Sequence, residues 1–429
     1  MPSSTPVRLN LTQLKKQAKE ILKAHHAGDA GAGPVLRRLP RFAAAMAPEI
    51  LAAPVHLADV QFALALEHGF DSWAHLKRHI EGLEPRPRGQ LMKEAGAVWI
   101  SRVPKLGWGL DRDCTFAGAL ESALAATDDP WPYWDLMAFT GLAFRVRWSA
   151  DFSASCAIGE MPDECAGLRA CTGWGTPTDV QFGQETTDRE AIRGWLVQSI
   201  DSGRPVLVYG LCLDMAVVYG YEAGGQILWL SDYHARGEMP VRLPLAKLGP
   251  MQIYLHREGP ALDDRLRLEH VLSLAGRNWG RREHDGGLPG RRYLYGEAAY
   301  EAWQEAIRGA DKLPPEQFAR LHHTHQFAWL TLADARQAAG RFLNEAGQTD
   351  LARTLPETAA AALRHAIGHA LAMAKRLSLA FDSQGFFQGP PPAWPADQRL
   401  AEFEILEGMK HQDALLHAEI AQALSALKA

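Results

Sequence analysis

The chain has 429 residues, 47% of them hydrophobic, which is typical of globular proteins and allows two to four domains. Its 45 basic and 50 acidic residues give a formal net charge of −5, which excludes a global electrostatic attraction to nucleic acid or to an anionic membrane. The opening residues lack the apolar stretch of a signal peptide, and no run of about eighteen uncharged apolar residues follows. We therefore expect a cytoplasmic protein without membrane-spanning segments.

Residues 1–84 are predicted to form a helical module. Apolar residues in LTQLKKQAKEILKAH recur at the spacing of one helix face, and the glycines and proline of residues 28–34 end that helix. Further helices are expected over 42–51 and 57–70, and over 72–83 with Asp71 or Ser72 as N-cap. The segment LADVQFALALEHGFDSWAHLKRHIE resembles helical modules found in bacterial multidomain proteins, often beside ankyrin repeats. That resemblance implies a packing role or docking to a protein partner.

A short linker, EPRPRG, precedes a central region over residues 95–258. Short apolar runs bounded by Gly, Pro and Asp predict strands at AFRVRW, PVLVYGL, AVVYGYE, QILWLSDY and MQIYLH. Two helices are expected at CTFAGALESALAAT and DREAIRGWLVQSIDSG, so we predict an α+β domain with an antiparallel sheet. Gly224 and Gly225 predict a two-residue hairpin turn, which brings the strand ends at Asp214 and Asp232 together.

Residues 264–429 return to helical periodicity and are predicted to form a bundle of four or more antiparallel helices. The helices are expected at GEAAYEAWQEAIRG, PEQFARLHHTHQFAWLTLADARQAAGRFLNEAG, LPETAAAALRHAIGHALAMAKRLSLAF and LAEFEILEGMKHQDALLHAEIAQALSAL. FFQGPPPAW is a loop between the last two, because three consecutive prolines cannot continue a helix.

The segment GWGLDRDCTFAGALESALA places Cys114 at the junction between a Gly-rich loop and an apolar helix. There, unpaired backbone N–H groups and the positive end of the helix dipole lower the pKa of a thiol. A thiolate then becomes available near neutral pH, as catalytic cysteines require. We therefore predict Cys114 as a nucleophile; the alternative is an apolar filler of the core, where cysteine is common.

The second half of the predicted site lies in GLCLDMAVVYGYEAGGQILWLSDYH. Its apolar strand, the Gly-Tyr-acid turn at residues 220–222 and the closing Asp232 resemble the strand-hairpin-strand of papain-like domains. Such domains occur in bacteriocin-processing peptidases and in the butirosin biosynthesis protein H family. The resemblance implies a papain-like fold for residues 95–258. Where those families carry the catalytic histidine, this chain has Asp214.

His234 follows Asp232 by two residues, on the same face if the strand continues, and is the candidate imidazole. A histidine of the C-terminal bundle is a second candidate for the base, and an exposed loop histidine is the alternative for His234. More broadly, PKLGWGLDRDCTFAGALESAL, DLMAFTGLAFRVRW, GRPVLVYGLCLDMAVVYGYE and RRYLYGEAAYEAW are similar to bacterial proteins related to the butirosin family, over residues 95–429. The named butirosin protein is an acyltransferase, and its fold relatives are thiol hydrolases.

Arginine and aromatic side chains near this site are candidates for ligand binding. AFRVRW places Arg145 and Arg147 on one side of a strand, where two guanidinium groups can hold a carboxylate or a phosphate. Trp108, just upstream of Cys114, is a further candidate. The alternative for the arginines is an exposed edge strand, and the aromatic residues of DDPWPYWDLM are expected in the core.

No cofactor is predicted, and no metal site is included in the prediction. Cys156, Cys165 and Cys171 lack the paired C-x-x-C motifs that hold zinc, and the five cysteines are too few for a disulfide framework. Histidine pairs offer an alternative: His365 and His369 at i, i+4 share a helix face and can hold a metal with a third ligand from a facing helix. The candidates for that helical metal site also include His322, His325, His411 and His417.

Two functions follow from these patterns. The first is thiol-dependent acyl transfer, or hydrolysis of an amide or peptide, on a small-molecule or peptide substrate. The second keeps the fold but not the catalysis, and uses the cleft with Arg145 and Arg147 to sense a ligand or to bind a partner.

Overall fold

The computed structural model describes residues 11–42, 45–67, 72–73, 76–77, 88–108, 112–153, 161–175, 188–209, 212, 214–235, 239–249, 251–284, 292–347, 351, 354–384 and 394–429. The chain divides into two compact units, Met1–Pro87 and Arg88–Ala429. Among the described residues, no helix combines the length and the apolar character needed to cross a bilayer.

The first unit is helical, as predicted for the N-terminal region. It contains α1 (Leu11–His26), η1 (Ala30–Ala32), α2 (Gly33–Leu36), η2 (Pro40–Phe42), α3 (Ala47–Ala52) and α4 (Leu57–Glu67). Gly28 has a φ of 71°, a left-handed conformation that glycine adopts readily, and it follows the end of α1. Leu36, Ile50 and Leu64 are fully buried in the core of this unit. The predicted cap Asp71 and most of the helix predicted over 72–83 lie outside the described residues.

The antiparallel sheet predicted in the central region is confirmed, with seven strands. They are β1 (Leu91–Glu94), β2 (Ala97–Ile100), β5 (Val206–Tyr209), β6 (Met215–Glu222), β7 (Ile227–Asp232), β8 (Val241–Pro244) and β9 (Gln252–Tyr254). Strand β7 pairs along one edge of β6, while β5 and β2 share the other edge. All residues of β6 before Glu222 are buried, so both of its faces are covered.

The hairpin between β6 and β7 differs from the prediction in its turn. Its connection is four residues long, Ala223 to Gln226, and begins with the short helix η5 (Ala223–Gly225), rather than being a two-residue turn. Ala223 adopts positive φ together with Gly224 and Gly225, and this accommodates the longer connection. The prediction that the start of β6 lies next to the end of β7 is confirmed, because Ala216 pairs with Asp232.

The central region also contains four helices: α6 (Thr115–Leu124), α7 (Tyr133–Phe139), α8 (Met161–Thr172) and α9 (Arg189–Asp201). Helices α6 and α9 both contact β6. The Asp188 side chain caps α9 by accepting a hydrogen bond from the Glu190 N–H (2.9 Å). Both helices predicted in this region are therefore present.

Two small antiparallel sheets lie outside the central one. The first contains β11 (Glu283–His284), β12 (Tyr293–Tyr295) and β3 (Arg147–Ser149), and the second contains β4 (Trp174–Gly175) and β10 (His256–Arg257). The strand predicted over AFRVRW is thus too long: Leu142–Phe144 form a 3-10 helix, η3. Gly141, with a φ of 76°, begins this turn. The carbonyls of Ala143 and Arg145 accept hydrogen bonds from Arg336 rather than from a strand.

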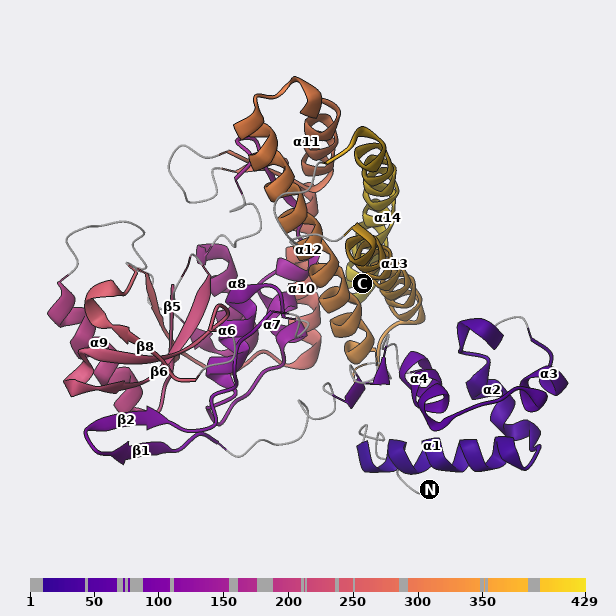
Figure 1. Ribbon diagram of the computed structural model, residues 1–429, viewed down its shortest axis with the longest axis horizontal. Coiled ribbons are helices and arrows are strands. Elements are labelled where there is room, and N and C mark those ends of the chain that lie inside the picture. The colour runs from indigo at the N-terminus through magenta and orange to yellow at the C-terminus, as the bar shows by residue number, and fades with distance from the viewer. Residues whose placement is uncertain are drawn as a thin grey trace. The chain divides into compact units, whose positions relative to one another are not determined.

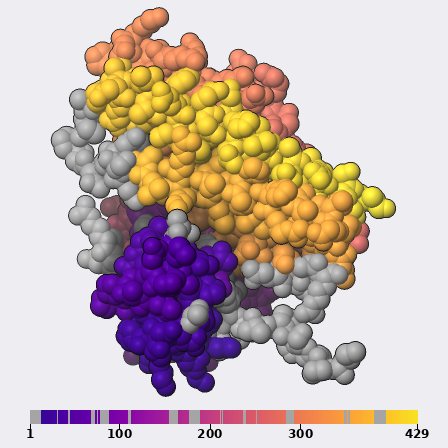
Figure 2. All heavy atoms as spheres, turned by 90° about the vertical axis from the view of Figure 1, so that its right-hand side faces the viewer, coloured from indigo at the N-terminus to yellow at the C-terminus, as the bar shows by residue number. Residues whose placement is uncertain are grey.

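The C-terminal helical region is confirmed. It contains α10 (Asp264–Gly280), α11 (Gly296–Arg308), α12 (Pro315–Ala346), α13 (Glu357–Gln384) and α14 (Ala396–Lys428). Figure 1 shows α6 and α7 between the sheet and α12, and Figure 2 shows α13 and α14 side by side along one face. Val217 of β6, Phe139 of α7 and Leu416 of α14 belong to one continuous core. The sheet and the C-terminal helices therefore fold around shared apolar surface.

Candidate functional site

Cys114 is the N-cap residue of α6, at the loop-to-helix junction predicted from the sequence. The helix behind it is apolar and buried, and Gly118 lets the Tyr233 hydroxyl approach closely, because a Cβ there would collide with that oxygen. The same hydroxyl donates to the Arg112 carbonyl (2.9 Å). These contacts hold the start of α6 against the end of β7.

The backbone of Cys114 is tied to the C-terminal helical region. Its N–H donates to the Tyr133 hydroxyl (2.9 Å), which in turn donates to Oδ2 of Asp334 on α12 (2.5 Å). Burial, and after it the negative charge of Asp334, raises the pKa of Tyr133 well above its ordinary value. The hydroxyl therefore keeps the proton that it donates.

The Cys114 thiol is not activated in the ligand-free protein. Burial raises its pKa to about 12, and the carboxylates of Asp334 and Glu164 act in the same direction. The Ala117 N–H and the Arg145 guanidinium lower it, but by less, and the sulfur makes no formal capping hydrogen bond. The residue keeps some exposed surface because it lines a pocket, although protein groups surround its sulfur. Desolvation outweighs the helix-terminus effect on which the prediction of a thiolate depended.

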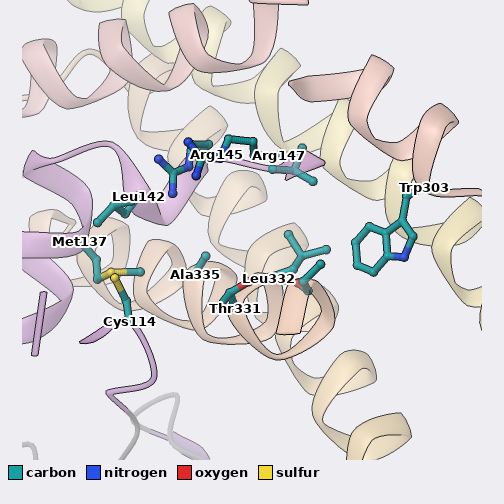
Figure 3. A pocket seen from close by; sticks show the side chains of 11 residues that line it. Cys114, Met137, Leu142, Arg145, Arg147, Trp303, Thr331, Leu332 and Ala335 are labelled. Atoms are coloured by element: carbon teal, nitrogen blue, oxygen red, sulfur yellow. Dashed lines mark hydrogen bonds between the residues drawn. The ribbon is translucent and has the colours of Figure 1, made fainter. Parts of the chain in front are cut away.

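This pocket lies between the α7–β3 segment and α12, and its empty space, mouth included, is about 430 Å³. Figure 3 shows its arrangement: Cys114 and Met137 at one end, Trp303 at the other, Arg145 and Arg147 along one side, and Thr331, Leu332 and Ala335 of α12 along the opposite side. Leu142, Val146 and Ala328 complete the lining. Two cations and a thiol therefore share a pocket whose other lining residues are mostly apolar.

The structure brings both predicted arginines into this pocket, and neither lies on an exposed strand edge. Nη1 of Arg145 lies 2.7 Å from Oε1 of Glu164, and both side chains are largely buried. The Arg147 guanidinium lies 4.2 Å from the centre of the Tyr293 ring, and Nη1 lies 3.5 Å from the Tyr295 hydroxyl. The groups in these two contacts of Arg147 are neutral.

A buried ion pair fixes the segment that carries these arginines. Arg336 of α12 donates through Nη1 to the carbonyls of Ala143 (2.9 Å) and Arg145 (3.3 Å). Its other nitrogens bind Asp413 of α14, and both side chains are fully buried. The sequence analysis missed Arg336, Asp413 and Asp334; charged residues within the apolar periodicity of long helices were the signal that could have revealed them.

The predicted His234, Asp214 and Asp232 come together near the start of α6, but none of them lines the pocket. Nε2 of His234 lies 2.7 Å from Oδ2 of Asp214, and Asp232 accepts a hydrogen bond from the His234 N–H (2.7 Å). Oδ1 of Asp214 lies 3.5 Å from the Thr115 hydroxyl. The His234 imidazole is thus paired with Asp214, and the Asp214 carboxylate lies beside Thr115, the residue that follows Cys114.

Trp108 packs on this second cluster rather than in the pocket. Its ring centre lies 4.9 Å from that of Tyr233 and 6.0 Å from that of His234, and the indole is partly exposed. Both contacts place it at the His234 end of the site.

Among the residues that the structure describes, no group of three or more His, Cys, Asp and Glu side chains is arranged to hold a metal ion. His365 faces Glu419 (3.4 Å), His369 contacts Gln412, and His417 stacks on Trp279. The alternative of a helical metal site receives no support from these contacts. Cys156 lies outside the described residues.

Comparison of the chain with protein-family models gives no match, and a search of curated proteins finds no similar sequence.

Proposed function

We propose that the protein binds a small organic anion in the Cys114 pocket. The observation that carries this proposal is the meeting of Arg145 and Arg147 with an apolar helix face in one pocket. A guanidinium has five N–H donors in a fixed plane, so it can hold a protein oxygen and a carboxylate or phosphate oxygen at once. Sites for small ligands combine apolar side chains with a few placed polar groups, and this pocket offers both.

The expected ligand carries one anionic group and an apolar body. The anionic group binds the two arginines, and the body lies against Leu332 and Ala335 of α12. Cys114 then contacts the end of the ligand nearest to Met137. A neutral analogue of the same shape lacks the ionic contact with the guanidinium groups and binds much more weakly.

Calorimetric titration tests this proposal with a series of monocarboxylates and monophosphates, each beside its neutral amide or alcohol. Arg147→Met should weaken the binding of the best anion at least tenfold, and Arg147→Lys should recover part of it, because an ammonium keeps the charge but not the planar fork. Arg364→Met is the matched control, since Arg364 pairs with Glu357 on an exposed helix face. Equal affinity for anion and amide, or an equal loss in the Arg364 variant, would refute the proposal.

We propose catalysis by Cys114 as the second function: thiol-dependent acyl transfer or amide hydrolysis by a papain-like domain related to the butirosin biosynthesis protein H family. Support comes from the cysteine at the N-cap of α6, from the pocket that reaches it, and from the Ala117 N–H near its sulfur. Because burial raises the pKa of the thiol to about 12, this function requires the thiol to lose its proton within the substrate complex.

A Cys114→Ser variant separates the two functions. If Cys114 is a nucleophile, this variant must bind the anion normally and lose turnover of the ester or amide of that anion. Full turnover by the serine variant eliminates catalysis and leaves the binding proposal intact.

A further inference from the structure

Asp334 is a carboxylate in an apolar setting. It lies on α12 between Ala333 and Ala335, is 8% exposed, and reaches toward α7. Burying an ionised carboxylate is unfavourable unless hydrogen bonds compensate it. The Tyr133 hydroxyl supplies one such bond at 2.5 Å.

The Tyr133 hydroxyl has one hydrogen, and its direction is determined by its neighbours. The Cys114 N–H can only donate, so a lone pair of the Tyr133 oxygen accepts it (2.9 Å), and the hydroxyl hydrogen points to Oδ2 of Asp334. The bonds run from the N-cap of α6, through α7, to α12. They join the cysteine backbone to the opposite wall of the pocket.

We infer that Asp334 is a positioning residue for Cys114: through the Tyr133 hydroxyl it holds the N-cap backbone and thereby directs the thiol into the pocket. This inference rests on the proposed role of that pocket in ligand binding, but the chain of hydrogen bonds exists without a ligand. A side chain that only filled space between α7 and α12 would be apolar, like its neighbours on the helix.

The ionisable groups that face the thiol come from several elements: Tyr133 of α7, Arg145 after η3, Glu164 of α8, Tyr233 after β7 and Asp334 of α12. Asp334 and Glu164 raise the thiol pKa, whereas Arg145 lowers it. Removing the charge of Asp334 should therefore favour the thiolate. The reactivity of the Cys114 thiol therefore reports on the charge of Asp334 as well as on its hydrogen bond.

The test is the rate of Cys114 alkylation by iodoacetamide at pH 9, followed by mass spectrometry of its peptide in the ligand-free protein. Asp334→Asn keeps an oxygen that accepts from Tyr133 and removes only the charge. Loss of this charge lowers the thiol pKa, and the gain in thiolate is partly offset by lower nucleophilicity, so about threefold faster alkylation is expected. Asp334→Leu also releases the N-cap backbone, and at least tenfold faster alkylation is expected.

Glu345→Gln is the matched control. Glu345 is also a carboxylate of α12 that accepts a hydrogen bond from an α7 aromatic, Trp134 (2.9 Å), and it is not among the groups that shift the pKa of Cys114. Its alkylation rate should equal that of the wild type. Equal rates for the Asn and Leu variants overturn the positioning role, as does a rate change in the Gln control. Because the experiment uses no ligand, its result can be interpreted even if the anion-binding proposal fails.

Discussion

Two histidine–carboxylate pairs in the second unit differ in their surroundings. Nε2 of His325 lies 3.1 Å from Oε2 of Glu402, and both side chains are fully buried. Nε2 of His234 lies 2.7 Å from Oδ2 of Asp214, but these side chains are 36% and 29% exposed. Water screens the exposed pair, so the shorter contact is expected to be the weaker one.

The buried pair belongs to a network that holds helices together. Trp303 of α11 donates to Nδ1 of His325 (2.9 Å), so the imidazole proton lies on Nε2, facing Glu402. Glu402 also accepts from Trp394 and Gln398. Burial by itself raises the pKa of Glu402, but His325, and after it the hydrogen bonds from Trp394 and Gln398, outweigh burial and lower it. Such buried, paired groups stabilise the fold, whereas the exposed pair at α6 stays accessible to other molecules.

The largest effect is expected from breaking the buried Arg336–Asp413 pair. Asp413→Ala leaves a guanidinium buried without its carboxylate and removes the acceptor of the Tyr300 hydroxyl (3.0 Å). We expect a loss of about 3–5 kcal/mol in the free energy of unfolding, measured by urea denaturation. Glu357→Ala, which breaks the exposed pair with Arg364, should change it by less than about 1 kcal/mol. Similar losses in both variants would contradict the distinction between buried and exposed pairs.

Acidification should destabilise the C-terminal helices through two buried histidines. Burial lowers the pKa of His322 and of His417 from 6.5 to about 4, so both are neutral in the folded protein. On acidification the unfolded chain binds these protons before the folded protein does. The contribution of the two neutral histidines to the free energy of unfolding is therefore fully present above pH 6.5 and is lost as the pH falls toward 4. For His417 the loss reaches about 3 kcal/mol at pH 4.

Unfolding by urea at pH 7, 5.5 and 4 measures this loss. His417→Phe keeps a ring to stack on Trp279 and removes one titrating group, so it should reduce the loss by roughly half. His365→Phe is the control, because His365 is exposed. An unchanged pH dependence in the His417 variant would show that this histidine is not responsible.

The smallest effect is expected at the exposed pair. Asp214→Ala should lower the free energy of unfolding by less than about 1 kcal/mol, and by still less in 0.5 M salt, since exposed charges are screened. Glu402→Ala should lower it several times as much, with little dependence on salt, because it leaves buried donors without an acceptor. A salt-independent loss at Asp214 would mean that this pair is shielded from solvent.

The coarse fold was predictable from local patterns. The helix at Cys114, the β6–β7 hairpin and the C-terminal helices follow from the period of their apolar residues, which neighbouring side chains determine. The turn after Glu222 and the length of the AFRVRW strand were predicted wrongly. Both depend on contacts from elsewhere, such as the Arg336 hydrogen bonds that draw the carbonyls of Ala143 and Arg145 away from strand pairing.

In the candidate site, too, local patterns predicted some residues, and contacts between distant parts of the chain decided the others. Arg145 and Arg147 were identified because charged residues stood out in an apolar run, and Cys114 because it precedes a helix. The partners Tyr133, Asp334 and Arg336 are distant in sequence, and no local pattern joins them.

The sequence by itself determined where helices and strands form and placed a thiol at a helix N-terminus. Only the tertiary structure decided the protonation of that thiol. Burial and the carboxylates of Asp334 and Glu164 outweigh the backbone N–H groups at the helix start. The reason is physical: periodicity is set by residues a few positions apart, whereas desolvation and charge depend on everything within a few ångströms, whatever its place in the chain.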